Sequence, residues 1–82
     1  MYQLYINENT LELKVGKLKK MFLNETRIID YLKDEPSDIY YYNDNYRLCG
    51  KRAPLVELAR TIRDGWLRQT KSMVQKIEEI KI

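Results

Sequence analysis

The chain has 82 residues, a formal net charge of +3, one cysteine and no histidine. This length allows one small domain, residues 1–82, and excludes a second buried core. A single cysteine excludes an internal disulfide and a zinc site, and the lack of histidine removes the commonest general base and transition-metal ligand.

The first predicted element is a β-hairpin. Residues 2–6 and 11–15 alternate apolar and polar side chains, which is typical of strands. A four-residue loop over 7–10 puts the apolar side chains of both strands on one face, whereas a slip of one residue would bury charged groups. The expected cross-strand pairs are Ile6–Leu11, Leu4–Leu13 and Tyr2–Val15.

Two short helical segments are predicted next. The first covers residues 17–23. The second begins at Asn24 as the N-cap, with Leu23 and Ile28 at hydrophobic-staple positions, and it ends before Pro36. The side chains expected on the inner faces of the two segments are Leu18, Met21, Phe22, Ile28, Ile29 and Leu32.

A second β-hairpin is predicted over residues 39–49, with a three-residue loop at 43–45. The loop opposes Tyr42 to Tyr46, Tyr41 to Arg47, Tyr40 to Leu48 and Ile39 to Cys49. One face then carries Tyr40, Tyr42, Tyr46 and Leu48, and the other carries Ile39, Tyr41, Arg47 and Cys49. Because both faces are partly apolar, we expect cover on both sides, one by the core and the other by a partner.

The C-terminal part predicts one long amphipathic helix over residues 54–80, with Pro54 in its first turn and Gly65 as a weak point. Its apolar stripe collects Leu55, Leu58, Ala59, Ile62, Trp66, Gln69, Met73, Ile77 and Ile80. A helix of this length overhangs so small a domain, and a homodimer through its last third is the simplest way to cover it. The predicted fold class is therefore α+β, with two β-hairpins, short helices between them and a long C-terminal helix.

A second apolar line on the long helix predicts a contact surface. Val56, Leu67 and Val74 fall close together on the helical wheel, with Arg63 among them, away from the main stripe. Tyrosine and arginine are also frequent anchors of protein interfaces. The candidate partner-binding residues are Tyr41, Arg47, Val56, Arg63, Leu67 and Val74.

An alternative function is nucleic-acid binding. Residues 24–50 carry three basic and six acidic side chains between two basic ends of the chain. The basic ends and the tyrosine-rich hairpin are compatible with phosphate binding and base stacking, although the tyrosines fit core packing or a protein interface as well. The residues of this alternative are Lys17, Lys19, Lys20, Lys51, Arg52, Tyr40, Tyr42 and Tyr46.

Catalysis is not expected. The sequence has no nucleophile-elbow, P-loop or dinucleotide-binding motif, so we predict a non-enzymatic protein without cofactor or metal. No apolar run is long enough to span a membrane, and the polar N-terminus is unlike a secretory signal. Together with the lone cysteine, this predicts a cytoplasmic protein.

From Met1 to Ile82 the chain resembles compact phage early proteins in its many Lys, Asn and Tyr residues, its single cysteine and its lack of a cofactor motif. In length and character it is similar to the cytoplasmic antiholin family of T-even phages. That resemblance implies a lysis inhibitor whose partner is the cytosolic part of a holin. It carries no functional residue over to this chain.

Overall fold

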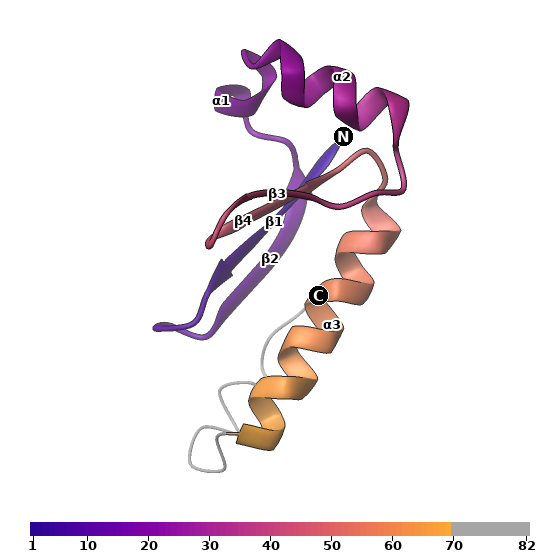
Figure 1. Cartoon of the computed structure of the whole chain (residues 1–82). Helices are drawn as coiled ribbons and strands as arrows, with labels where there is room; N and C mark the ends of the chain where they lie inside the picture. Colours follow the sequence, from indigo (N-terminus) through magenta and orange to yellow (C-terminus); the bar gives the residue numbers. More distant parts are fainter. Residues whose placement is uncertain (70–82) are drawn as a thin grey trace.

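The computed structural model describes residues 1–69 and confirms the α+β fold. A four-stranded antiparallel sheet has α1 and α2 on one side and α3 on the other (Figure 1). The elements are β1 Tyr2–Asn7, β2 Glu12–Lys17, α1 Lys20–Leu23, α2 Thr26–Asp34, β3 Tyr40–Asn43, β4 Tyr46–Cys49 and α3 Arg52–Gln69.

The first hairpin forms, but the expected pairs are wrong by two residues. Ile6 pairs with Leu13, and Leu4 pairs with Val15. The loop has the predicted length but covers residues 8–11, because the Asn7 side chain accepts hydrogen bonds from the backbone of the loop and Leu11 takes a left-handed φ of 56°. A shift of two residues keeps every side chain on its expected face, so the buried face was predicted correctly.

The helices between the hairpins differ from expectation at their ends. Asn24 is the C-cap of α1 and not the N-cap of α2, which is Glu25 without a side-chain cap. Phe22 is fully buried, whereas its neighbour Met21 is 52% exposed because α1 is a single turn. Pro36 does follow the end of α2, as predicted. Ile28 and Leu32 are buried, and Ile29 is half-buried.

The second hairpin forms with a shorter loop than expected. Tyr40 opposes Leu48 and Tyr41 opposes Arg47, as predicted, but Asn43 takes the place of Tyr42 opposite Tyr46. The register shifts between Tyr41 and Asn43. The Asn43 carboxamide accepts hydrogen bonds from the backbone of Asn45 and Tyr46, which closes a turn of two residues, 44–45.

The sheet has the strand order β2-β1-β4-β3, so the two hairpins join through β1 and β4. Two hydrogen bonds between Asn45 and Ile6 strengthen this junction. The Ile6 N–H donates to the backbone carbonyl oxygen of Asn45, and the Asn45 side-chain amide donates to the carbonyl oxygen of Ile6. Each face of the sheet buries one apolar cluster. The cluster under α3 contains Leu4, Ile6, Leu13, Cys49, Leu55 and Ala59, and the cluster under α1 and α2 contains Phe22, Ile28, Leu32 and Leu48.

The stripe of α3 is confirmed from Leu55 to Trp66. Leu55 and Ala59 are fully buried, and Leu58, Ile62 and Trp66 pack partly buried against the same cluster. Gln69 is exposed at the end of the described helix. The predicted continuation to residue 80, with Met73, Ile77, Ile80 and the dimer contact, lies outside the described residues. Among residues 1–69 no helix is long and apolar enough to cross a membrane.

Candidate interaction surfaces

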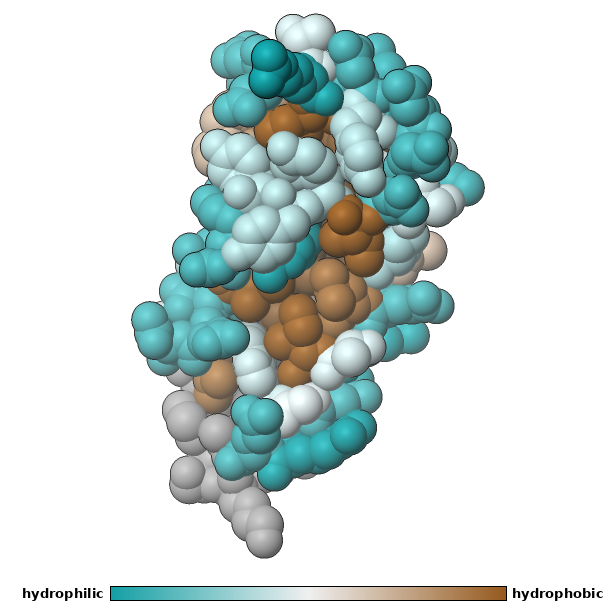
Figure 2. Space-filling view, viewed as in Figure 1, coloured by the Kyte–Doolittle hydropathy of each residue, from teal (hydrophilic) through white to brown (hydrophobic). Residues whose placement is uncertain are grey.

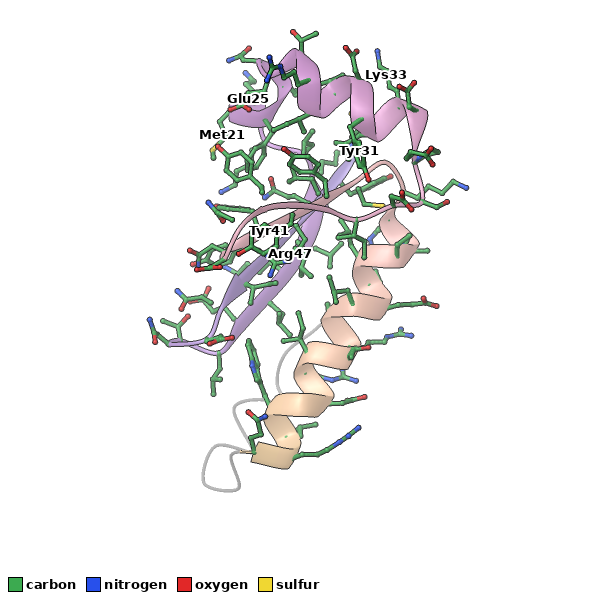
Figure 3. The ribbon with its side chains drawn as sticks, viewed as in Figure 1. Met21, Glu25, Tyr31, Lys33, Tyr41 and Arg47 are labelled. Carbon is green, nitrogen blue, oxygen red and sulfur yellow. The ribbon has the colours of Figure 1, made fainter. Side chains whose placement is uncertain are left out.

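Tyr41 and Arg47 form a contact that we call the hairpin pair. They are direct partners across β3 and β4, and the guanidinium carbon of Arg47 lies 4.2 Å from the centre of the Tyr41 ring (Figure 3). Arg47 also donates to the carbonyl oxygens of Asn43 and Tyr46, which holds its side chain over the hairpin. With 57% of its surface exposed, Tyr41 presents an ordered aromatic ring to solvent.

The Tyr41 hydroxyl donates a hydrogen bond to the carboxylate of Asp44 in the turn. This hydrogen bond raises the pKa of Tyr41 above its ordinary value. Partial desolvation and the negative charge of Asp44 raise it further, while Arg47 opposes the shift. Tyr41 is therefore neutral at physiological pH. Asp44 holds its hydroxyl group, and the Arg47 guanidinium packs against the face of its ring.

Three of the remaining partner-binding candidates lie on α3. Val56, Arg63 and Leu67 are all half-buried, and their spacing places them on one side of the helix, which we call the α3 flank. Arg63 contacts the Asp64 carboxylate at 3.6 Å. The sixth candidate, Val74, lies outside the described residues. The structure thus brings Tyr41 and Arg47 into contact and places the α3 flank on a separate element.

The face of the molecule between α3 and the sheet is partly apolar. Figure 2 shows hydrophobic residues gathered at the centre of this face. Ile39 directly precedes β3, two residues from Tyr41 along the chain, and is 37% exposed. α3 packs on β2, β1 and β4, whereas β3 is the outer strand. The hairpin pair therefore lies on a part of the sheet that forms an edge.

The three tyrosines of the nucleic-acid alternative lie on the opposite face and are half-buried under α1 and α2. The Tyr42 ring meets Phe22 edge-on at 4.8 Å, and the Tyr46 ring meets Phe22 at 5.3 Å. Tyr40 packs beside Tyr31 of α2, with ring centres 5.5 Å apart. The three tyrosines that were candidates for base stacking therefore pack mostly inside the domain. They lie on one face of the hairpin, as the alternation of the strands predicted.

The basic residues of the alternative are exposed and gather at one end of the sheet. Tyr2 pairs with Lys17 on one side and with Cys49 on the other, so the end of β2 and the end of β4 lie either side of β1. Lys19 and Lys20 follow directly after β2. Lys51 and Arg52 follow directly after β4. Lys19 alone contacts one of the three tyrosines, donating from Nζ to the Tyr46 hydroxyl at 3.2 Å.

A hollow of about 320 Å³ lies over β1 and β2 on the face of the sheet opposite α3. We call it the open-face hollow. Its lining residues are Gln3, Tyr5, Lys14, Lys19 and Tyr46. The sequence analysis did not include Tyr5 or Lys14 among the candidate site residues. The alternation puts Tyr5 and Lys14 on one face of the first hairpin, but their place beside Tyr46 depends on the pairing of β1 with β4.

No group of acidic, histidine and cysteine side chains within residues 1–69 is arranged to hold a metal ion. Cys49 is fully buried, and its thiol donates to the carbonyl oxygen of Pro36 at 3.2 Å. This thiol therefore has a packing partner inside the domain. Tyr31 also has a raised pKa, caused by partial desolvation and by its contact with Asp38.

The fold and surfaces were compared with known proteins. No family model, curated protein or solved structure was found to match the chain.

Proposed function

We propose that this chain is a small non-enzymatic regulatory protein that acts by binding a protein partner. The observation that carries the proposal is the hairpin pair. An exposed tyrosine ring is held over an arginine guanidinium at 4.2 Å on the outer part of the sheet. Tyrosine and arginine are the side chains most enriched at the energetic centres of protein interfaces.

The order of the hairpin pair supports the proposal on energetic grounds. Binding costs entropy whenever a free side chain must be fixed, at roughly 0.5–1.5 kcal/mol for each flexible side chain. Asp44 and the Asn43 carbonyl already restrain Tyr41 and Arg47 in the free protein. A partner that covers the pair therefore incurs less of that cost.

The surroundings favour an apolar partner surface. Ile39 is exposed near the pair, and hydrophobic residues gather between α3 and the sheet in Figure 2. The α3 flank adds Val56 and Leu67, with Arg63 between them. A partner segment with aliphatic side chains and a carboxylate would complement these groups. The mechanism is stoichiometric occupation of the partner, without turnover.

The resemblance to cytoplasmic antiholins supplies a first partner to test, which is the cytosolic segment of a holin. This segment is titrated into the protein by calorimetry. The proposal predicts saturable binding that is weakened by Tyr41→Ala. A holin segment that does not bind removes the lysis-inhibition part of the proposal and leaves the search for another partner.

Photo-crosslinking in the cell tests the surface itself. A photoreactive phenylalanine analogue replaces Tyr41 in one variant and Tyr31, which is 37% exposed on α2, in the control. We expect a discrete crosslinked product with one partner chain from position 41 and none from position 31. Equal products from both positions, or none, would show that the hairpin pair is not the binding surface.

A further inference from the structure

We infer that the open-face hollow binds single-stranded nucleic acid, with one base stacked on Tyr5 and a backbone phosphate between Lys14 and Lys19. This site lies on the opposite face of the sheet from the hairpin pair, because Tyr46 and Arg47 are consecutive on β4 and point to opposite faces. The inference is therefore independent of the proposed protein partner.

The two central strands of the sheet carry the aromatic part of the site. Tyr5 and Tyr46 are direct partners in the β1–β4 register, with ring centres 5.4 Å apart. Phe22 packs against Tyr46 from the α1 side. One ring, Tyr5, is thus at the end of the aromatic row, next to β2, which packs against α3 on the opposite face of the sheet. Bases stack on such rings whatever their sequence, because every base has a flat π-face.

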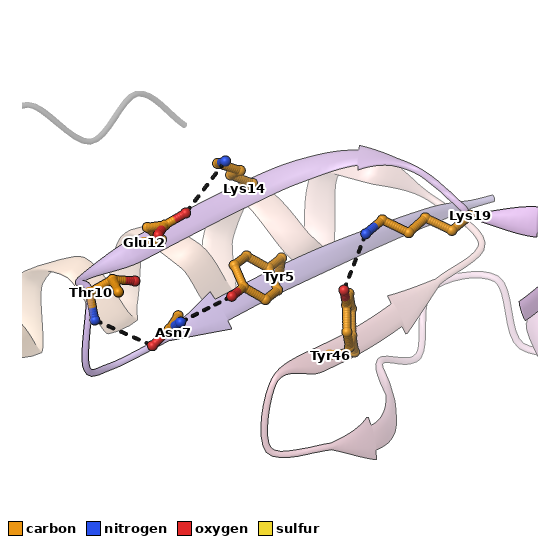
Figure 4. A network of polar contacts seen from close by, with 7 residues as sticks. All are labelled: Tyr5, Asn7, Thr10, Glu12, Lys14, Lys19 and Tyr46. Carbon is orange, nitrogen blue, oxygen red and sulfur yellow. Dashed lines mark hydrogen bonds and ion pairs between the residues drawn. The ribbon is translucent and has the colours of Figure 1, made fainter. Parts of the chain in front are cut away.

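Polar contacts hold both rings in place (Figure 4). The Asn7 side chain donates to the Tyr5 hydroxyl at 3.0 Å, and the Lys19 ammonium donates to the Tyr46 hydroxyl at 3.2 Å. The loop in turn fixes the Asn7 side chain, because its Oδ1 atom accepts hydrogen bonds from the backbone N–H groups of Asn9 and Thr10. The same loop that sets the hairpin register therefore orients Tyr5.

β2 leaves room for a base beside the Tyr5 ring. Lys14 lies opposite Tyr5 in the register, and Gly16 is the next residue on the same face. A Cβ added to Gly16 would meet no atom within 4 Å. Because Gly16 has no side chain, this face of β2 is open next to Gln3, the partner of Gly16 in the register and a lining residue of the hollow.

The charge at this site suits phosphate. Lys14 and Lys19 both line the hollow and supply two ammonium groups there. Glu12 partly offsets Lys14, with its carboxylate 3.4 Å from the ammonium nitrogen in an exposed pair. Removing the Glu12 carboxylate should therefore strengthen the binding of an anion. If the ion pair only stabilised the hairpin, its removal would not increase the affinity for an anion.

The test is fluorescence anisotropy with three labelled probes of equal length: an oligothymidine strand, an abasic strand with the same phosphates, and a duplex. We expect the single strand to bind more tightly than the other two. The logarithm of its affinity should fall with the logarithm of salt with a slope of roughly −0.7, the value for one neutralised phosphate of a single strand. Equal binding of the abasic strand would sink the stacking proposal, as would no binding at low salt.

Matched variants locate the site. Tyr5→Leu should weaken single-strand binding by roughly fivefold or more, while Tyr41→Leu on the opposite face leaves it unchanged. Gly16→Val should abolish stacking without loss of fold, because β-branched residues favour strands and a Cβ added at Gly16 meets no atom within 4 Å. Glu12→Gln should tighten binding. Equal losses in Tyr5→Leu and Tyr41→Leu, or full binding by Gly16→Val, would overturn the assignment.

The same variants separate this inference from the proposed function. Tyr41→Leu is expected to impair binding of the protein partner and to spare the oligonucleotide. Tyr5→Leu is expected to do the reverse. Loss of only one activity in each variant would support both proposals, and the failure of either one leaves the other measurable.

Discussion

A Cβ placed on Gly50 would lie 2.7 Å from the carbonyl oxygen of Leu32, closer than any side chain tolerates. It would also lie 2.8 Å from the Cα of Pro36. The chain leaves β4 at this point and enters α3, passing directly against the end of α2, where the Lys51 N–H donates to the Pro36 carbonyl oxygen at 3.0 Å. The chain can pass this close to the end of α2 because residue 50 has no side chain.

We predict that Gly50→Ala destabilises the domain by about 1–3 kcal/mol, since the contacting atoms are backbone and cannot rotate away. Gly65→Ala is the matched control. It lies within α3 with no atom within 4 Å of its added methyl group, and it should stabilise the protein by up to about 1 kcal/mol. Urea unfolding of both variants measures the free energies. Equal effects of the two substitutions would contradict the packing at Gly50.

Phe22 is the centre of the layer under α1 and α2, and it packs against Tyr42 and Tyr46. We predict that Phe22→Ala lowers the free energy of unfolding by about 3–5 kcal/mol, from lost burial and the cavity left behind. In a domain of this size that is a large part of the total stability. The readout is the denaturation midpoint.

Met21→Ala is the control for Phe22→Ala, because the two residues are adjacent in the same helical turn and Met21 is half-exposed. Its effect should stay within about 0.5 kcal/mol. A larger loss in Met21→Ala than in Phe22→Ala would contradict the burial of Phe22 and the exposure of Met21, two residues that the sequence pattern had placed on the same inner face.

The alternation of the strands predicted which side chains are buried on each face of the sheet, but not which residues oppose one another in the first hairpin. The reason is local. Asn7 captures two loop N–H groups, and Leu11 adopts a left-handed backbone that its residue type disfavours. A period-two pattern is unchanged by a shift of two residues, so the pattern contained no information to choose between these registers.

The candidate surfaces show the same division between local and long-range information. The pairing of Tyr41 with Arg47 follows from their place in one hairpin and was predictable. The contact between Tyr5 and Tyr46 depends on β1 meeting β4, a pairing of residues far apart in the sequence that no local pattern specifies. The open-face hollow was therefore not predicted, although the face on which each of these side chains lies was predicted.

The pKa of Tyr41 gives a prediction on pH. Because the folded-state pKa is raised, the folded protein holds this proton more tightly than the unfolded chain, whose tyrosines titrate near about 10. The resulting stabilisation is complete below that pH and is lost as the pH rises through the folded-state value. Titration of ¹³C-labelled tyrosines by NMR should place the midpoint of Tyr41 above that of a free tyrosine.

Two substitutions isolate the cause of this shift. Asp44→Asn keeps a residue suited to the turn but removes the charge, so the pKa of Tyr41 should fall toward its ordinary value. Asp38→Asn should instead lower the pKa of Tyr31, which contacts Asp38, and leave Tyr41 unchanged. If Asp44→Asn leaves the titration midpoint of Tyr41 unchanged, the hydrogen bond between Tyr41 and Asp44 does not persist in solution.

The α3 flank carries the last prediction, which rests on the proposed function. Leu67 is half-buried, whereas Leu55 is fully buried under the sheet. A carboxylate at position 67 can reach water, but one at position 55 cannot and would be charged and unpaired in the core. We therefore expect Leu67→Asp to abolish binding of the partner identified through Tyr41 while retaining the circular-dichroism spectrum and most of the stability. Leu55→Asp should unfold the protein. An unfolded Leu67→Asp variant would assign Leu67 to the core and remove it from the binding surface, leaving the hairpin pair to carry the interaction alone.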